Sequence, residues 1–270
     1  SAEGYVLDKN PVPFTIDGSV ETVVVEKTNT AQKGKISVQK TGNVFASVTA
    51  LGSAIYIDEN GEVHESGQTA YTPVFAKENL SGAVFQVIAS EDIITADGTI
   101  RANAGDVVAE LVTDENGYAE TDLLYLGKYE VKEITAPDGY VLNAESQFVE
   151  LTYAGQEIAV RDTVGTAFEN DYQGIEISLS KVMENDEKFG ISAEESYKNV
   201  RFGLFAAEDI TAADGSVIPA DGLIAEVSLN EDMTAVIAEK IPFGKYYVQE
   251  IATDEHYILN GKKYLVNFEY

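Results

Sequence analysis

GKYEVKEITAPDGYVLN, at Gly127–Asn143, recurs further along the chain as GKYYVQEIATDEHYILN, at Gly244–Asn260. In both copies apolar side chains alternate with polar ones, which predicts a β-strand with one buried face that runs into a loop. Glu133 and its counterpart Glu250 fall on the apolar side of their strands. Burial of an unpartnered carboxyl group is costly, so the repetition indicates that this group has partners inside the fold.

The two stretches belong to a longer internal repeat. Residues 83–153 match residues 200–270 without a gap, and each unit opens with a short strand that ends in lysine. We expect the chain to be a segment of a longer protein, in three parts. These are residues 1–33, the C-terminal strands of a preceding unit; residues 34–171, a complete domain with an inserted hairpin near 54–66; and residues 172–270, a second domain that lacks its last strand.

The periodicity of the chain favours an all-β fold. Short segments of alternating or β-rich sequence are separated by Asp-Gly and Asn-Gly turns, and no long helical pattern competes with them. The extra residues of the first unit include SAIYIDENGEVHES (Ser53–Ser66), which predicts a hairpin around an Asn60-Gly61 turn. Strands of this length and spacing predict tandem immunoglobulin-like β-sandwich domains.

Composition and charge narrow the range of partners. With 46 acidic residues against 18 basic ones the formal net charge is -28, so we expect neither nucleic acid nor an anionic membrane as a partner. The chain has no cysteine, which excludes disulfides and thiolate chemistry. His64 and His256 lie far apart without a metal-ligand pattern, and the acidic turns lack the ligand spacing of a calcium loop. We expect no metal and no cofactor.

Three polar side chains share the inward faces of predicted strands in the first unit. Lys40 ends the apolar stripe of the first strand, Glu133 lies on a later strand, and Asn170 ends the last one. The second unit repeats the lysine as Lys181 and the glutamate as Glu250. Each residue by itself has an ordinary explanation, as a lysine that reaches water, a buried ion pair or turn chemistry. Three residues in phase, two of them repeated, favour a common function.

This pattern resembles the B-type (CnaB) repeat domains of Gram-positive surface adhesins and the similar, SpaA-like domains of sortase-assembled pilins. The resemblance is carried by the first-strand lysine Lys40, by the Tyr-x-Val-x-Glu-Ile-x-Ala-Pro-x-Gly-Tyr box at Tyr129–Tyr140, and by the terminal strand that ends at Asn170. It implies a prealbumin-like β-sandwich. It also implies an intramolecular isopeptide bond between Lys40 and Asn170 that Glu133 assists.

Burial agrees with the chemistry that the resemblance implies. An amide condensation needs a neutral lysine, and burial favours the neutral forms of both a lysine and a glutamate. Glu133 would polarise the Asn170 carboxamide and relay protons while the Lys40 amine displaces ammonia. The reaction is a single autocatalytic turnover, so we do not expect an enzyme.

The second unit departs from the pattern. Its box lacks the proline and the glycine, and the asparagine partner of its lysine does not occur before Tyr270. Lys181 and Glu250 are therefore expected to be unreacted. Asn29 is the mirror case, because the lysine and glutamate of its own unit would precede residue 1. The alternative is a head-to-tail strand swap, in which Asn29 of one chain meets Lys181 of the next.

These expectations describe a structural stalk or backbone segment of a bacterial cell-surface adhesin or pilin. Its partners would be neighbouring domains of the same surface protein or pilus, and its location would be extracellular, attached to the cell wall of a Gram-positive bacterium. The alternative is a ligand-binding adhesin module that recognises a host matrix protein or a glycan, with the hairpin around Ile55–His64 as the place to look. A hydrolase built on paired carboxylates rests only on the abundance of Asp and Glu.

Overall fold

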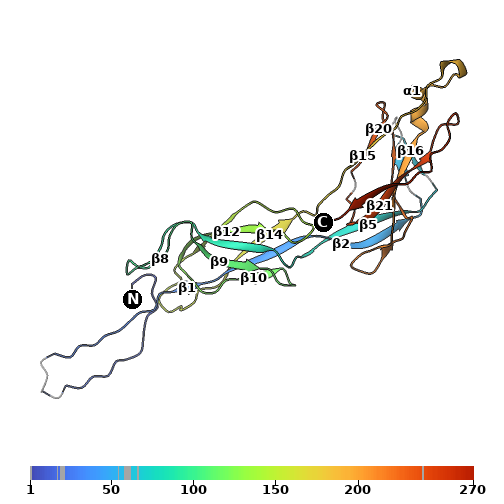
Figure 1. The fold of residues 1–270 in the computed structure, drawn as a ribbon. Helices are drawn as coiled ribbons and strands as arrows, with labels where there is room; N and C mark the ends of the chain where they lie inside the picture. The colour runs from blue at the N-terminus through green and yellow to red at the C-terminus, as the bar shows by residue number, and fades with distance from the viewer. Residues whose placement is uncertain are drawn as a thin grey trace. The chain divides into compact units, whose positions relative to one another are not determined.

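The computed structural model describes residues 2–16, 18, 22–53, 55–57, 62–65, 67–238 and 240–270. Within these residues the chain is all-β, as predicted, apart from one four-residue helix and two short 3-10 helices (Figure 1). Its contacts divide it into two compact units. The first is Ser1–Gly42 with Glu78–Asp171, and the second is Asn43–Lys77 with Tyr172–Tyr270.

The first unit contains two sheets that enclose a common core. One sheet has the strand order β13-β12-β6-β9, with every pair antiparallel. In the other, β2 pairs antiparallel with β10 along one edge and parallel with β14 along the other. The strands are β2 (Ile36–Leu51), β6 (Val84–Ala89), β9 (Val107–Val112), β10 (Tyr118–Glu120), β12 (Gly127–Thr135), β13 (Gln147–Leu151) and β14 (Val164–Asn170), with the short pairs β1 (Lys33–Gly34) and β11 (Leu124–Tyr125), and β7 (Ile93–Ile94) and β8 (Ile100–Ala102).

The alternation of the sequence places the core of the first unit between these sheets. Ile36 and Val38 of β2, Phe85 of β6 and Val131 of β12 are fully buried. Phe168 of β14 packs against Phe85, with their ring centroids 4.8 Å apart. β14 therefore pairs with the edge of the sheet and also covers the core. Its last residue, Asn170, lies on the inner face.

The second unit repeats this topology with two differences. The order β22-β21-β16-β19 corresponds to β13-β12-β6-β9, and β5 and β2 extend this sheet beyond β19. In the facing layer β15 pairs with β20, as β2 pairs with β10, but no described strand takes the place of β14. The elements are β5 (Ala70–Asn79), β15 (Ile177–Ser180), β16 (Arg201–Ala206), β19 (Leu223–Ser228), β20 (Thr234–Ile237), β21 (Gly244–Ala252) and β22 (Tyr264–Phe268), with the short pairs β3 (Ile55–Ile57) and β4 (Val63–Glu65), and β17 (Ile210–Thr211) and β18 (Val217–Ile218), and the helices η1 (Glu187–Phe189), α1 (Ala193–Ser196) and η2 (Tyr197–Asn199).

Residues 43–77 lie in the second unit, although the boundaries drawn from the sequence place them in the domain at 34–171. The physical reason is aromatic packing. The ring centroids of Phe45 and Phe75 lie 5.9 Å apart, and those of Phe75 and Tyr172 lie 5.1 Å apart. Aromatic pairs of this kind bury large areas, and here they join β2 and β5 to the core of the second unit.

The hairpin predicted near residues 54–66 corresponds to β3 and β4. These strands pair antiparallel, with Tyr56 opposite His64. The Asn60-Gly61 turn that the sequence predicts between them lies outside the described residues.

The described residues before β1 form no named strand, unlike the expected strands of a preceding unit. Tyr5 and Ala31 make one isolated antiparallel bridge, and residues 22–30 are exposed. Gln32 anchors the end of this segment, because its buried side chain accepts the backbone N–H of Ala154. The segment is also tied to the first unit by the N–H of Leu7, which donates to the backbone oxygen of Gln156, and by the ion pair of Lys9 with Glu157. It has no neighbouring strand in the described part of the chain.

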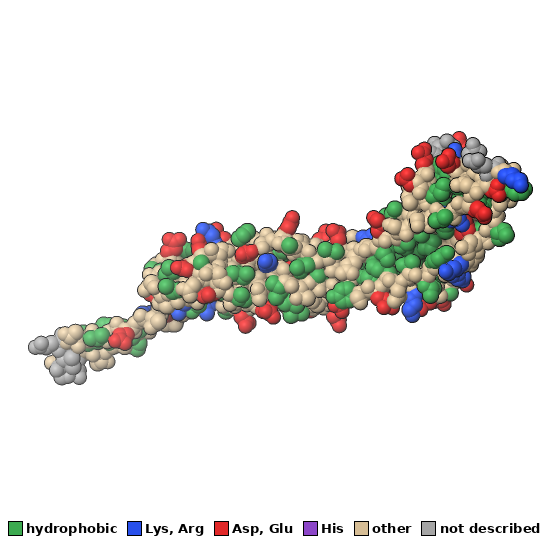
Figure 2. All heavy atoms as spheres, turned by 45° about the horizontal axis from the view of Figure 1, so that its top comes forward, with side chains coloured by type: hydrophobic (Ala, Val, Ile, Leu, Met, Phe, Trp, Pro, Cys, Tyr) green, Lys and Arg blue, Asp and Glu red, His purple; other side chains and the backbone are tan. Residues whose placement is uncertain are grey.

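Acidic side chains are scattered over the face of the molecule shown in Figure 2, with fewer lysines and arginines between them. This distribution follows from the net charge of -28 and favours a well-hydrated surface. None of the helices among the described residues has the length and hydrophobicity that a membrane span requires.

Candidate functional site

Lys40, Glu133 and Asn170 meet in the core of the first unit. The Nζ of Lys40 lies 2.5 Å from the Oδ1 of Asn170, and the Nδ2 of Asn170 donates to the Oε1 of Glu133 at 3.0 Å. The lysine Nζ and the glutamate Oε1 are 3.6 Å apart. Relative exposure is 0% for the lysine and the glutamate and 1% for the asparagine, so the structure brings the three residues together away from water.

The strand register explains why these side chains meet. In the parallel pairing of β2 with β14, Phe168 lies opposite Lys40 and Asn170 lies opposite Gly42. Lys40 and Asn170 therefore project from neighbouring strands onto the same inner face, one pleat apart. Glu133 reaches them from β12, which belongs to the facing sheet.

Burial shifts the acid–base equilibrium of Lys40 toward its neutral form. Desolvation by burial lowers the pKa of Lys40, although the Glu133 and Glu169 carboxylates act in the opposite direction. The Oε2 of Glu133 accepts the backbone N–H of Asn143 at 2.9 Å, while its Oε1 accepts from the Asn170 amide. Glu133 is thus held at both oxygens, and one of them contacts the amide nitrogen of its neighbour.

The lysine nitrogen is also close to the carbon of the carboxamide. The Oδ1 of Asn170, 2.5 Å from the Nζ of Lys40, is bonded to Cγ at about 1.2 Å. The distance from the nitrogen to that carbon is therefore at most about 3.7 Å. Reacting atoms in near-attack arrangements lie at about 3–3.5 Å, so a small shift suffices for attack.

Glycines and large side chains seal the site. A Cβ on Gly42 would lie 2.5 Å from the Cδ1 of Leu80 and 3.0 Å from a ring carbon of Tyr140. Gly117 has a φ of 67°, and a Cβ there would lie 2.3 Å from the backbone oxygen of Lys40. Only glycine satisfies both the backbone conformation and the close approach at this second position. The side chain of Lys40 itself is completely buried.

Sequence reasoning missed two residues of this site. Asn143, which orients Glu133, closes the repeated stretch and recurs as Asn260, so the repeat itself was the available signal. Gly42 carried no local signal, because only the folded chain places Leu80 against it.

Lys181 and Glu250 form the matching pair in the second unit. The lysine Nζ lies 2.7 Å from the Oε1 of Glu250, whose Oε2 accepts the backbone N–H of Asn260 at 2.8 Å. The lysine side chain is 19% exposed, whereas the lysine side chain of the first unit is completely buried. No described side chain takes the place of Asn170, so the lysine and the glutamate contact each other directly.

Asn29, the remaining residue of the predicted cross-links, lies in an exposed segment that forms no strand. Its contacts in the described part of the chain do not include Lys181 or Glu250. The pairing of Asn29 with Lys181 therefore stays a prediction.

His256 and the acidic turn at Asp114 have ordinary hydrogen-bond partners. Across the described residues, no group of three or more His, Asp or Glu side chains is placed to hold a metal ion. The ring of His256 lies 2.6 Å from Asp254, and this hydrogen bond raises the pKa of the histidine. Asp114 accepts the backbone N–H groups of Asn116 and Tyr118, which is turn chemistry. The similar turn at 58–61 lies outside the described residues.

The two facing sheets, with a terminal strand parallel to the first, define the class of the first unit as a prealbumin-like β-sandwich. Residues 74–164 match the family model described as SpaA, prealbumin-like fold domain. This match confirms the resemblance seen in the sequence.

The chain is also similar to individual proteins. The chain is 28% identical over 141 residues to the trypsin-resistant surface T6 protein of Streptococcus pyogenes serotype M6, a match that covers 52% of this chain and 23% of that protein. The TIE protein of Bacillus anthracis is similar in structure, with a TM-score of 0.51 and 20% identity over 89% of this chain and 32% of that one. The full-length major pilin SpaD from Corynebacterium diphtheriae gives a TM-score of 0.32 and 14% identity over 87% and 65%. The chain thus spans less than a quarter of the T6 protein.

Proposed function

We propose that the chain is a structural segment of a Gram-positive surface protein or pilus, built from tandem immunoglobulin-like domains, and that its first unit forms an isopeptide bond between Lys40 and Asn170. One observation carries the proposal. A buried lysine with a lowered pKa contacts a carboxamide, which a glutamate holds from its other side. An ordinary ion pair would not need the amide, and a buried ion pair adds little to stability.

The proposed reaction balances without a cofactor. The neutral Lys40 amine attacks the Cγ of Asn170, and Glu133 carries the amine proton to the Nδ2 of the carboxamide. A bond forms between Cγ and Nζ, the bond between Cγ and Nδ2 breaks, and ammonia leaves. Folding supplies the proximity that an encounter in solution lacks. Because the lysine and the asparagine are consumed, the chain reacts once and is not an enzyme.

The benefit of the bond is mechanical and thermodynamic. It joins β2 to β14 and closes a loop between residues 130 positions apart. By analogy with a disulfide, closing a loop of this length stabilises the fold by about 4–5 kcal/mol through the unfolded state. A chain without cysteine thereby gains a covalent link that reductants do not cut.

The location and partners follow from the same proposal. The similarity to a streptococcal surface protein supports an extracellular, cell-wall-attached position. The partners would be neighbouring domains or subunits of the same assembly. Recognition of a host matrix protein or a glycan by the hairpin stays the alternative, and the exposed side chains of Ile55 and Val63 are where such a partner would bind.

The intact mass of the purified chain tests this proposal. We expect the mass to be one ammonia below the value calculated from the sequence, and Lys40→Ala, Glu133→Ala and Asn170→Ala to restore the full value. Lys35→Ala is the matched control, because Lys35 forms a partly exposed ion pair with Glu120 and should keep the deficit. A full, unmodified mass for the natural chain would overturn the proposal.

A further inference from the structure

Glu226 on β19 is a buried acidic residue that the isopeptide chemistry does not use. Its side chain is completely buried, and its Oε2 accepts from the Nη1 of Arg201 at 3.0 Å. Its Oε1 is also buried and has no hydrogen-bond partner among the described residues. A buried acceptor without a partner is costly, and such groups are rare in folded proteins. This oxygen therefore points to a donor from outside the chain.

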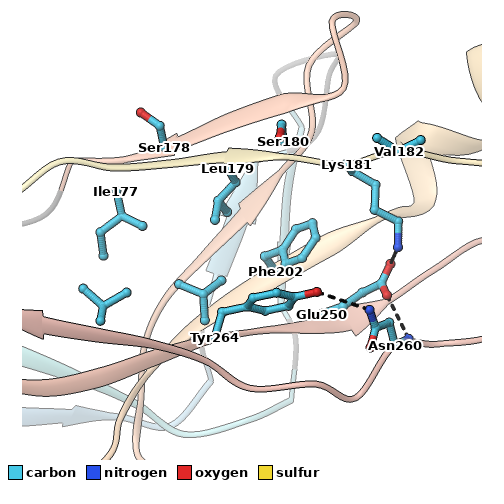
Figure 3. Close-up of a pocket in the computed structure, with 12 residues that line it drawn as sticks. Ile177, Ser178, Leu179, Ser180, Lys181, Val182, Phe202, Glu250, Asn260 and Tyr264 are labelled. Atoms are coloured by element: carbon cyan, nitrogen blue, oxygen red, sulfur yellow. Dashed lines mark hydrogen bonds and ion pairs between the residues drawn. The ribbon is translucent and has the colours of Figure 1, made fainter.

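The glutamates of the two lysine sites show the usual arrangement. Each oxygen of Glu133 and of Glu250 has a hydrogen-bond or ion-pair partner. For Glu250 these partners are Lys181 and the backbone N–H of Asn260 (Figure 3). Glu226 differs from both, because only one of its two oxygens is used.

The first unit has a glutamate at the same position of its sheet, but at the surface. Glu226 lies opposite Gly203 in the pairing of β19 with β16. In the first unit Glu110 lies opposite the matching residue Gln86, and it is exposed. The sheet therefore forms without burial of this carboxylate, and a buried ion pair is a weak source of stability. Burial of the group in the second unit indicates a role other than folding.

A pocket of about 200 Å³, here called the Glu226 pocket, includes this residue in its lining. β5 contributes Thr72 and Pro73, β3 contributes Ile55, and β19 contributes Ile224 besides the glutamate. All of its lining residues belong to the second unit. Ile55 is 58% exposed, so solvent reaches this wall. The pocket combines apolar side chains with one buried acidic residue.

Pro73 explains why the sheet is open at this point. β5 and β19 run parallel and, in the described part of the chain, pair only through Ala70 and Leu223. Pro73 and Glu226 each lie three residues beyond this pair. Because proline has no backbone N–H to donate, it interrupts the ladder of hydrogen bonds between the strands. The Glu226 pocket thus lies where the pairing ends.

We propose that the Glu226 pocket binds one lysine side chain of a protein partner, with its ammonium group on the Oε1 of Glu226 and its aliphatic stem against Ile55 and Ile224. A lysine side chain combines an apolar stem with a terminal cation, as this lining requires. The volume favours a single side chain over a free ligand, because small-molecule sites usually measure about 300–1,000 Å³. This binding does not depend on the isopeptide bond.

Charge complementarity favours a basic partner. The net charge of -28 attracts cations to the chain. The side chain of Arg201 is 24% exposed, so water partly screens its charge, whereas the carboxylate beside it is completely buried. A second cation on the unused oxygen would give the carboxylate a charge-assisted hydrogen bond at both oxygens.

Titration of the ¹⁵N-labelled chain with Nα-acetyl-lysine methylamide, followed by NMR, tests the inference. We expect saturable shifts of the backbone amides of Thr72, Ile224 and Glu226. Nα-acetyl-norleucine methylamide keeps an apolar stem but lacks the ammonium group. It should bind at least about tenfold more weakly, because a hydrogen bond between charged groups is lost.

Two variants locate the binding. Glu226→Gln should weaken binding of the lysine probe by about tenfold or more. Glu110→Gln is the matched control, because it removes the same charge from the exposed position of the first unit and should leave the affinity unchanged. Thr72→Phe fills the pocket from an exposed position and should abolish binding while the Arg201–Glu226 pair stays intact. This variant keeps the inference testable if Glu226→Gln does not fold.

Equal affinity for the lysine and norleucine probes would overturn the inference, as would equal affinity of the natural chain and Glu226→Gln. Tighter binding of Nα-acetyl-tyrosine methylamide would also overturn it, because the occupant would then be a neutral donor. The ammonia deficit of the first unit should be the same in all these variants as in the natural chain. A chain without that deficit can be titrated in the same way, so failure of one proposal is distinguishable from failure of the other.

Discussion

Lys40 and Lys181 occupy the same place in the repeat but have different partners. Lys40 contacts the Asn170 amide and is completely buried, whereas Lys181 contacts Glu250 directly and is partly exposed. The two sites differ by one carboxamide, which the first has and the described residues of the second lack. An amide between lysine and glutamate separates the charges and gives the amine a carbon to attack.

The lowered pKa of Lys40 predicts a pH dependence in a chain that cannot react. In Glu133→Ala the amine stays unmodified and loses the carboxylate that raises its pKa, and the unfolded chain keeps its proton up to a pH of about 10.5, the ordinary value. The folded chain releases the proton at lower pH, so it binds fewer protons than the unfolded chain between the two values. The free energy of unfolding should therefore rise with pH across this window and level off above it.

Denaturant unfolding at a series of pH values measures this rise. The double variant Lys40→Met with Glu133→Ala is the control and should lack it. The natural chain should lack it too if the proposed bond has formed, because the lysine then no longer titrates. Equal slopes for the single and double variants would contradict the assignment of the pKa shift to Lys40.

β14 is the strand that the first unit has and for which the described part of the second unit has no counterpart. It pairs with β2 along its whole length, from Val164 opposite Ile36 to Asn170 opposite Gly42, and it also covers the core with Phe168. The same strand thus closes the sheet, fills the interior and delivers the amide. Loss of its packing should affect stability and cross-linking together.

Phe168→Ala tests the packing of β14. Removal of a buried phenylalanine should lower the free energy of unfolding by about 3–5 kcal/mol. It should also lower the fraction of the chain that shows the ammonia deficit, because the strand holds its last residue less firmly.

Phe148→Ala is the matched control. Phe148 lies on the neighbouring strand β13 but is 73% exposed, so its removal should change stability by about 0.5 kcal/mol or less. Similar losses for both variants, measured by denaturant unfolding of chains that also carry Lys40→Ala, would contradict the role given to β14.

For the whole molecule, the proposed bond determines how much of the chain can extend under force. The loop between Lys40 and Asn170 contains most of the first unit and also residues 43–77, which pack in the second. A covalent link at its two ends removes this loop from the path of a force applied to the chain ends. The strands within residues 43–77, which pack in the second unit, would then also be protected from extension.

Single-molecule force extension should show this shielding. The two residues are 130 positions apart, and an extended chain spans about 3.3–3.6 Å per residue, so Lys40→Ala should add roughly 450 Å of contour length. Lys35→Ala should leave the extension of the natural chain unchanged. Equal contour lengths for Lys40→Ala and the natural chain would contradict a bond that carries load.

Much of the fold and of the candidate site could be read from side-chain alternation. Successive side chains of a strand point to opposite faces, and this alternation depends only on neighbouring residues. The inward positions of Lys40, Glu133 and Asn170 therefore followed from their apolar neighbours. The contact of Asn143 with Glu133 did not follow, because a loop residue has no such periodicity. The position of residues 43–77 did not follow either, because their sequence predicts a hairpin but not the core against which it packs.

By itself, the sequence determined the all-β class, the repeat, and which side chains face inward, since all three depend on residue patterns within one strand or between two similar stretches. The tertiary structure alone decided which strands are neighbours. It placed β14 beside β2, and it put residues 43–77 in the second unit. Strand pairing joins residues that are far apart along the chain. It depends on which edges and apolar surfaces are exposed once the rest has folded.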